Sequence, residues 1–479
     1  MQPDENQQTQ NEFNRREFIQ NAASFGAMMA MMGGVPLFAE ETNAPAGGET
    51  HYRASATPMN FAVIGCGTQG REIIQTLSRI TSPPNDPPVV PLAPVVAICD
   101  TYEAAFRRVK EAAPNAETFT DYHKLLEKKE VEAVVVATPS HLHREIVEAA
   151  LAAGKHVYCE APLATSFDDT RAIAKAAKAA VRVHFQSGLQ MRSDPQRIFL
   201  VPFIHSRQTG MNVMARTLWH KKQSWRRAAP TPEREAALSW RVNSATSPGL
   251  MGEQVIHQLD MVNWLLNIRP VAVSGWGANL VWKDGRDVAD TVQAMFEMPD
   301  GSNYFADASI GTSFDSAYEI LHGSDSTVLL RSDDEGSRAW LFKEVDSPLL
   351  GWEVYPPKVQ FYKETGITLM AGASKTPPKQ KAGEAPLAVK TPLQFAFEAF
   401  ITNCGTVGKE VKNFLGSKVS DDPDDLREYL GTVKQTHAWK GAAGWQEGLE
   451  ATVLALKANE AIIKGGGTKI QIEKAWFEV

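Results

Sequence analysis

The chain has few cysteines, no excess of basic residues and no long apolar run. Its four cysteines among 479 residues have neither the spacing of a zinc site nor that of a disulfide framework, so we expect buried thiols and no bound metal. The formal net charge of −7 argues against nucleic acid as a partner. Apolar residues at 43% and charged residues at 22% are ordinary for a soluble globular protein, and the length suits two or three domains.

The N-terminal region is typical of a targeting segment. The sequence NRREFIQ at 14–20 resembles a twin-arginine export motif, and a mildly apolar run follows at 22–35. That run is too short and too rich in glycine for a good membrane span, so we expect no stable span in the mature protein. We interpret 1–39 as a twin-arginine signal and 40–58 as a flexible linker. The expected destination is the periplasm or cell envelope.

A glycine-rich turn is the most informative motif. An apolar run at 61–65 enters a Gly-x-Gly-x-x-Gly turn, and an amphipathic segment at 70–80 leaves it, as in a dinucleotide-binding unit. In such a turn Gly65 makes the tight bend, Gly67 lets backbone approach a pyrophosphate, and Gly70 lets helix pack on strand. The phosphates would lie at the helix N-terminus beside Thr68 and Gln69, where free N–H groups and the helix dipole favour anions.

An acidic residue after the next strand indicates which nucleotide binds. The run 95–99 is apolar and β-prone, and Asp100 ends it. A carboxylate there accepts the ribose hydroxyls of the adenosine half and repels a 2′-phosphate, so NAD is favoured over NADP. NADP remains possible because Arg107 and Arg108 are near enough in sequence to meet a phosphate.

Strands and helices alternate through the first part of the chain. We expect further strands at 133–137 and 156–159 and helices at 103–113, 141–153 and 167–180. This order is typical of an α/β fold, with a doubly wound parallel sheet at 59–181. Ligands of such sheets bind beyond the carboxyl ends of the strands, so the residues that follow those strands should converge on one crevice. They are Thr138, Pro139, His143 and Glu160.

Taken in order, these motifs resemble the Gfo/Idh/MocA family, the glucose–fructose oxidoreductase and inositol dehydrogenase group. The matching stretches are the glycine turn, Asp100, TPSHLH at 138–143, GKHV at 154–157, EAP at 160–162 and EQVIH at 253–257. The resemblance implies an N-terminal Rossmann domain and a C-terminal α+β domain with an open-faced, mostly antiparallel sheet. It also implies tightly bound NAD or NADP and a sugar or cyclitol substrate. Homo-oligomers through the C-terminal sheet are common in the family.

Two departures from the family pattern affect the expected chemistry. The usual Glu-Lys-Pro is Glu160-Ala161-Pro162 here, so the lysine that assists proton transfer in the family's dehydrogenases is absent. The usual Asp-x-x-x-His is Glu253-x-x-x-His257, with both residues on one helical face. We predict that His257 is the acid/base, Glu253 its partner and Glu160 an organiser of the cleft. The alternative for His257 is a core histidine.

We assign 182–479 to the second domain. Strands are expected at 271–280, 291–297, 302–308, 317–322 and 327–331, and helices at 391–415 and 445–464. The range 343–390 is expected to be an irregular excursion. Aromatic residues interleaved with cations suit a sugar, so the candidate substrate-binding residues are His220, Lys221, Trp225 and Tyr318, with His322 on the same sheet face as Tyr318. A surface loop and core packing are the alternatives.

Three functions fit these observations. The first is an NAD(P)-dependent oxidoreductase that acts on a sugar, cyclitol or glycoside. The second is a redox-neutral glycosidase or lyase that uses the same bound NAD through a transient keto-sugar, because the lysine is missing. The third is a non-catalytic sugar-binding protein that retains the fold.

Overall fold

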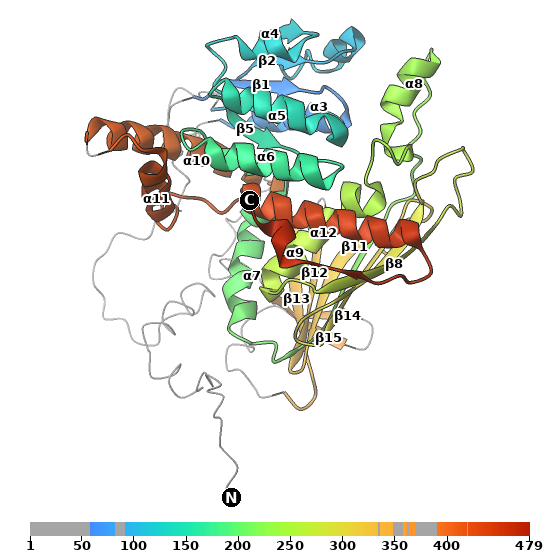
Figure 1. Ribbon diagram of the computed structural model, residues 1–479. Helices are drawn as coiled ribbons and strands as arrows, with labels where there is room; N and C mark the ends of the chain where they lie inside the picture. The colour runs from blue at the N-terminus through green and yellow to red at the C-terminus, as the bar shows by residue number, and fades with distance from the viewer. Residues whose placement is uncertain are drawn as a thin grey trace, which may run out of the picture.

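The computed structural model describes residues 58–81, 92–333, 336–347, 358–361, 364–369, 390–418 and 420–479. The predicted signal at 1–39 and almost all of the predicted linker at 40–58 lie outside these residues. Within them, no helix combines the length and the apolar character that a membrane span needs. Two sheets organise the chain, one with six strands and one with ten. They form two layered units joined side by side (Figure 1).

The first sheet is the predicted parallel sheet. Its strand order is β3-β2-β1-β4-β5-β6, and all five strand pairs are parallel. The central strands β1 and β4 are uniformly apolar and buried, as expected of strands covered on both faces. The strands are β1 Phe61–Ile64, β2 Val95–Cys99, β3 Glu117–Phe119, β4 Ala133–Val136, β5 His156–Cys159 and β6 Phe185–Ser187. The connecting helices are α3 Thr68–Arg79, η1 Glu103–Arg108, α4 Tyr122–Leu126, η2 Ser140–Leu142, α5 His143–Ala152 and α6 Phe167–Ala179.

The boundary predicted at residue 181 is wrong in two respects. Strand β6 extends the parallel sheet beyond it. In addition, helix α10 (Pro392–Gly416) returns from far along the chain and packs on this sheet. The ring of Phe397 stacks on Tyr158 with centroids 4.5 Å apart, and meets Phe61 edge-on at 6.4 Å. The first domain therefore takes one covering helix from the C-terminal half. Helix α11 (Pro423–Val433) packs against α10 in a small separate cluster.

The second sheet is mostly antiparallel, as predicted. Its order is β14-β15-β13-β12-β11-β7-β10-β9-β8-β16, and the one parallel pair within its described strands joins β10 to β7. The strands are β7 Asn212–His220, β8 Ala272–Ala278, β9 Thr291–Glu297, β10 Asn303–Ser309, β11 Ala317–Gly323, β12 Ser326–Asp333, β13 Gly336–Lys343, β14 Lys358–Phe361, β15 Glu364–Leu369 and β16 Ile470–Gln471. Strands β14 and β15 lie inside 343–390, so the expectation of an irregular excursion is wrong for those residues.

Among the described residues, helices cover one face of this sheet and leave the other open. Helices α7 (Pro195–His205), α9 (Ile256–Leu266) and α12 (Trp445–Lys464) lie along the inner face (Figure 1). Alternate strand residues such as Phe296, Tyr304 and Leu321 pack into one core with α9 and α12. The remaining short elements are η3 Gln190–Ser193, α8 Pro232–Leu238, η4 Trp240–Val242, the π-helix η5 Met251–Val255 and η7 Lys474–Phe477.

Candidate functional site

Two of the three glycines of the turn have no room for a side chain. Gly65 has a φ of +98°, and a Cβ on it would lie 2.6 Å from the carbonyl oxygen of Ala137. A Cβ on Gly70 would lie 1.8 Å from the carbonyl oxygen of Gly65, because here the helix packs directly on the strand end. A Cβ on Gly67 would meet nothing within 4 Å. The space above Gly67 is therefore open, as an approaching phosphate requires.

The start of α3 has the features of an anion site. Gly67 is its N-cap and supplies no side-chain hydrogen bond to the first N–H groups, and Gly67 and Thr68 are exposed. Nearby, Thr138 follows β4 next to Gly65, and its buried Oγ1 has no partner among the described residues. These residues fit a dinucleotide: the helix N-terminus suits the pyrophosphate, and the unpaired hydroxyl suits a polar group of the ligand.

Asp100 lies beside the glycine turn. It follows β2, and its Oδ2 accepts a hydrogen bond of 2.9 Å from the backbone N–H of Cys66 in the glycine turn. Its Oδ1 accepts from the N–H of Tyr102, also at 2.9 Å. The carboxylate is thereby fixed beside the turn and keeps lone pairs for ribose hydroxyls.

Glu160 is hydrogen-bonded to the helix that follows the glycine turn. It follows β5, and its Oε1 accepts a hydrogen bond of 3.0 Å from Nε2 of Gln69 on α3. Gly188 lies beneath it, since a Cβ on Gly188 would be 2.6 Å from Oε2. Burial, with a smaller contribution from Glu72, raises the pKa of Glu160 to about 7, although Gln69 and the charge of Arg241 oppose the rise. This carboxyl can therefore hold or release a proton near neutral pH.

Glu253 is the centre of a hydrogen-bonded cluster that joins the two domains. Its Oε1 accepts from Oγ of Ser140 at 3.2 Å, in the loop after β4, and from Oγ of Ser247 at 3.4 Å. Its Oε2 accepts from Nε of Arg241 at 3.1 Å. Burial raises the pKa of Glu253, and the ion pair and hydrogen bonds with Arg241 oppose it. The π-helix η5 carries Glu253, and such wide turns are frequent at functional sites.

His257 does not pair with Glu253 as we expected. The three partners of Glu253 are Arg241 and the two serines, and no charge contributes to the pKa of His257. Burial alone lowers that pKa to about 4, so the imidazole is neutral at pH 7. Its buried Nδ1 has no hydrogen-bond partner in the described part of the chain. A neutral ring can accept a proton, so the acid/base role of His257 remains a prediction that this geometry permits.

His143 has structural contacts. It is 1% exposed, its Nδ1 lies 3.0 Å from the carbonyl oxygen of Pro162, and its Nε2 lies 3.0 Å from that of Thr138. It therefore connects the loop after β4 to the loop after β5. Pro139 precedes η2 as its N-cap. A direct contact of His143 with the cofactor stays a prediction, for which these hydrogen bonds give no support.

The four predicted substrate-binding residues are not brought together with His257. His220 and Tyr318 belong to strand positions whose side chains face away from α9, and Nε2 of His220 lies 3.2 Å from Oδ2 of Asp307 on that same open face. Trp225 is 7% exposed and packs in the core of the second domain, and Lys221 is exposed. Their substrate-binding role stays a prediction without support from their positions.

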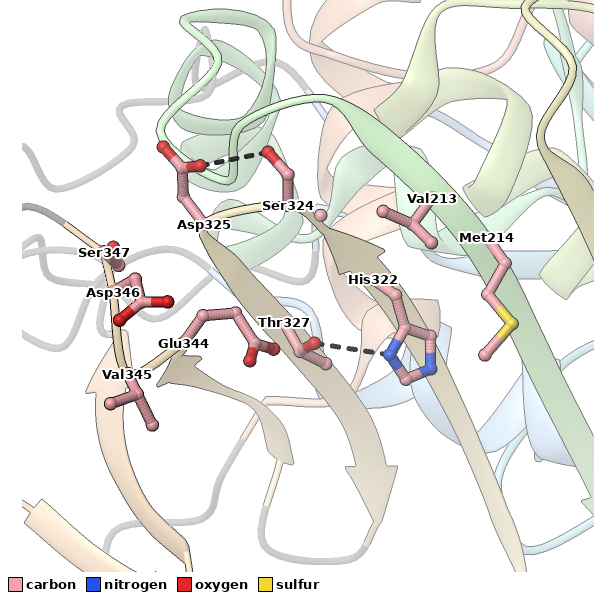
Figure 2. A pocket seen from close by; sticks show the side chains of 11 residues that line it. Val213, Met214, His322, Ser324, Asp325, Thr327, Glu344, Val345, Asp346 and Ser347 are labelled. Carbon is pink, nitrogen blue, oxygen red and sulfur yellow. Dashed lines mark hydrogen bonds between the residues drawn. The ribbon is translucent and has the colours of Figure 1, made fainter.

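A hollow of about 530 Å³ also lies away from the nucleotide site. Figure 2 shows His322 and Met214 on neighbouring strands of the open sheet face, with Glu344 and Asp346 nearby. Nδ1 of His322 lies 3.3 Å from Oγ1 of Thr327. The position of His322 on the same face as Tyr318 agrees with the predicted alternation, but this face is opposite to α9.

Sequence reasoning missed several residues of the site. Ser247 and Gly188 come from connections between elements, and Arg241 comes from the three-residue helix η4, which is too short for a periodic pattern to mark it. The side chain of Gln69 was expected beside the phosphates, and its Nε2 donates a hydrogen bond to Glu160. The only signal for Arg241 was a cation next to an aromatic residue, Trp240, in a segment rich in both.

Comparison with known proteins identifies the family. Residues 59–187 match the GFO_IDH_MocA model, described as an oxidoreductase family with an NAD-binding Rossmann fold. Residues 217–328 match the GFO/IDH/MocA C-terminal domain, and the two matches together span about half of the chain. The chain belongs to the GFO/IDH/MocA family. The first match ends at the last residue of β6, in agreement with the extended first domain.

Curated relatives of this GFO/IDH/MocA protein include inositol dehydrogenases. Inositol 2-dehydrogenase of Salmonella typhimurium is 27% identical over 210 residues, which are 44% of this chain and 55% of that protein. Inositol 2-dehydrogenase 2 of Saccharopolyspora erythraea is 30% identical over 208 residues, 43% of this chain and 54% of that protein. The matched region thus spans about half the length of these relatives.

Solved structures share the fold over most of the chain. Levoglucosan dehydrogenase in complex with NADH has a TM-score of 0.63 and 16% identity, with 87% of this chain and 100% of that chain covered. Aldose-aldose oxidoreductase from Caulobacter crescentus in complex with glycerol has a TM-score of 0.58 and 17% identity, with the same coverage. At identities this low, the structural similarity shows that the two-domain fold is shared and shows nothing about substrate.

Proposed function

We propose that this protein oxidises a hydroxyl of a sugar or cyclitol with NAD as the hydride acceptor. One observation carries the proposal: α3, whose N-terminus is built for a pyrophosphate, also holds Glu160 through Gln69 at 3.0 Å. The nucleotide site and a carboxyl with a pKa of about 7 are thus parts of one structure. The inositol and levoglucosan dehydrogenases among the similar proteins support a polyol as substrate.

Each candidate site residue has a proposed role in binding the cofactor or in transferring a proton. The glycine turn would hold the pyrophosphate, and Asp100 the adenosine ribose. The chemistry that NAD supplies when bound is acceptance of a hydride from the carbon that bears the hydroxyl. His257, which is neutral at pH 7, takes the hydroxyl proton on its imidazole. Glu160 holds or releases a proton at its carboxyl, and the buried cluster around Glu253 fixes the helix that carries His257.

The decisive experiment measures cofactor content and its redox state. The purified protein is denatured, and released NAD(H) and NADP(H) are quantified before and after incubation with myo-inositol, levoglucosan and a panel of glycosides. Stoichiometric NAD that becomes NADH with one polyol supports the proposal. Protein that contains no nucleotide and takes up none refutes it and leaves a sugar-binding protein. NAD content above the level expected for rapid exchange supports tight binding.

A redox-neutral glycosidase or lyase is the second candidate, and Ala161 favours it. Alanine provides no amine to the reacting hydroxyl, whereas Glu160, with its pKa of about 7, is suited to remove a proton from carbon beside a transient ketone. Cleavage of a glycoside with NAD that stays oxidised after many turnovers supports this route over net oxidation.

Two further proposals concern the setting of the enzyme. We infer export by the twin-arginine route to the periplasm or cell envelope. The test compares the cellular location of a fusion protein with that of the same fusion in which Arg15 and Arg16 are replaced by lysine.

We also infer a homo-oligomer through the open sheet face, where Phe305 and Trp276 are each 43% exposed and Met214 is 36% exposed. A mass of one protomer in analytical ultracentrifugation contradicts the oligomer.

A further inference from the structure

Arg241 is fixed in place by two residues of the second domain that themselves contact the first domain. It lies on η4, and its Nε donates to Oε2 of Glu253 at 3.1 Å. Its guanidinium carbon lies 4.4 Å from the ring centroid of Trp240. The Trp240 ring in turn lies 6.2 Å from the ring of His141, in the loop after β4 of the first domain. The guanidinium is therefore held at the junction where the loops of the nucleotide domain meet η5.

The same guanidinium retains unused hydrogen-bonding capacity. The side chain is 38% exposed, and Nε is the one nitrogen of its guanidinium with a hydrogen-bond partner within the described residues. Both terminal nitrogens are thus available to a ligand, and their fixed planar geometry suits one or two oxygens. The charge of Arg241 also acts on Glu160, which adjoins Ala161. The positive charge of Arg241 lowers the pKa of both Glu160 and Glu253.

We propose that Arg241 is the cation that orients the reacting hydroxyl, with its terminal nitrogens donating to the hydroxyl oxygen. The proposal rests on the oxidoreductase function given above. An arginine does not release its proton at neutral pH, so it cannot act as the base. It would stabilise negative charge on the oxygen while the hydroxyl proton passes to His257. Arg241 would thus supply, from the second domain, the positive charge that Ala161 lacks in the first.

The test compares Arg241→Gln and Arg241→Lys with a matched control at Arg269. Arg269 is 39% exposed, donates from Nε to Glu450 at 2.8 Å and lies 4.1 Å from the Phe477 ring. It therefore repeats the ion pair and ring contact of Arg241 away from the cleft. Arg269→Gln measures the effect of losing such contacts on stability alone. Melting temperatures and NAD content of all variants are measured first.

The first measurement needs no substrate. The carboxyl titration of Glu160 is followed by isotope-edited infrared spectroscopy, with Glu160→Gln to assign the band. The charged neighbours of Glu160 are Glu72 on α3 and Arg241, so Arg241→Gln should raise its pKa, and Arg241→Lys and Arg269→Gln should leave it near the parent value. An unchanged pKa in Arg241→Gln overturns the proposal, whatever the turnover.

The second measurement is turnover of myo-inositol and levoglucosan at saturating NAD. Arg241→Gln should lower kcat by about 100-fold or more, as loss of a donor to a developing oxyanion does, and Arg241→Lys should recover part of it. A kcat within threefold of that of Arg269→Gln overturns the proposal. If the parent oxidises neither these two polyols nor any member of the panel used above, the proposed function fails, and the infrared titration still decides whether Arg241 controls the charge of the site.

Discussion

The glycine turn allows cofactor binding to be separated from stability by single methyl groups. At Gly67 an added Cβ meets nothing within 4 Å, and the backbone φ of −67° suits alanine. Gly67→Ala should therefore fold with an unchanged melting temperature. The methyl group would occupy the space that a pyrophosphate needs and weaken its hydrogen bonds to the helix N-terminus. Bonds to a charged group contribute about 1.5–3 kcal/mol each, so losing one weakens NAD binding roughly 10- to 150-fold.

Gly70→Ala should show the opposite behaviour. Its Cβ would lie 1.8 Å from the carbonyl oxygen of Gly65, so α3 must move by more than an ångström relative to β1. Overpacking of this kind costs about 1–3 kcal/mol, and more where backbone must move. Gly408→Ala on α10 is the matched control, because its Cβ meets nothing and alanine favours a helix by about 0.5–1 kcal/mol.

The assay is thermal and urea unfolding of the three variants together with NAD affinity by calorimetry. Gly67→Ala should lose affinity without losing stability, Gly70→Ala should lose stability, and Gly408→Ala should lose neither. Parent-like NAD affinity in Gly67→Ala would refute the assignment of the phosphate site. A Gly70→Ala protein as stable as Gly408→Ala would refute the close packing of helix on strand.

Three further predictions concern charged groups. The pKa of Glu160 is about 7 in the folded protein and 4.5 when free, so ionisation of Glu160 destabilises the fold as pH rises from 4.5 to 7. The loss of stability is about 3 kcal/mol when ionisation is complete. Urea unfolding of Glu160→Gln should lack this decline. His257 has its pKa lowered from 6.5 to about 4, so its stabilising contribution is present above pH 6.5 and lost as pH falls towards 4; His257→Gln should lessen acid destabilisation in that window. Arg234 on α8 lies 4.0 Å from the ring of Tyr102, two residues after Asp100, so Arg234→Ala should release NAD about two- to fivefold faster in stopped-flow measurements.

Each of these has a contradicting outcome. Parallel pH-stability curves for Glu160→Gln and the parent between pH 4.5 and 7 would show that Glu160 ionises normally. A His257 imidazole signal that titrates near pH 6.5 in the folded protein would contradict its burial. Lys457→Ala, which removes a similar contact with Trp476 at 4.1 Å away from the nucleotide site, is the control for Arg234→Ala. Equal NAD release from these two variants would rule out a role of α8 in retention.

The sequence predicted β1, β2, β4 and β5 of the first sheet and β8 to β12 of the second because their patterns are local, whereas β3, β6 and β13 were not predicted. Strand β4 is apolar at every position, as expected of a strand covered on both faces, whereas buried residues alternate along β9, as expected of a strand covered on one face. The range predicted for β9 is the observed one. Helix α10 shows what local patterns leave out. Its apolar face predicts burial but not the partner, and the contact of Phe397 with Tyr158 joins residues more than 200 positions apart. Strands β14 and β15 are short, and the prolines around them favoured an irregular segment.

The sequence predicted the site residues whose role depends on backbone geometry better than the hydrogen-bond partners of the polar side chains. The contacts of Gly65 and Gly70 agree with the steric requirements of the turn, and the phosphate-binding role of Gly67 stays a prediction that the open space beside it permits. The spacing of Glu253 and His257 suggested a pair, but a π-helix and two serines give Glu253 other partners. Neither the π-helix nor the position of Arg241 has a periodic signal, so spacing alone misassigned the partner.

Burial has opposite effects on the pKa values of the two groups proposed to transfer protons, Glu160 and His257. Burial raises the pKa of Glu160 to about 7 and lowers that of His257 to about 4. At pH 7 the histidine is a neutral acceptor, while the carboxyl is present in both protonation states. Net oxidation needs only the acceptor, so its rate should be level between pH 5 and 8 if Glu160 takes no part. A redox-neutral elimination needs a base and an acid in turn, so its rate should bend near pH 7 and lose that bend in Glu160→Gln. A rate that is level between pH 5 and 8 would therefore argue against the redox-neutral route even before the products are identified.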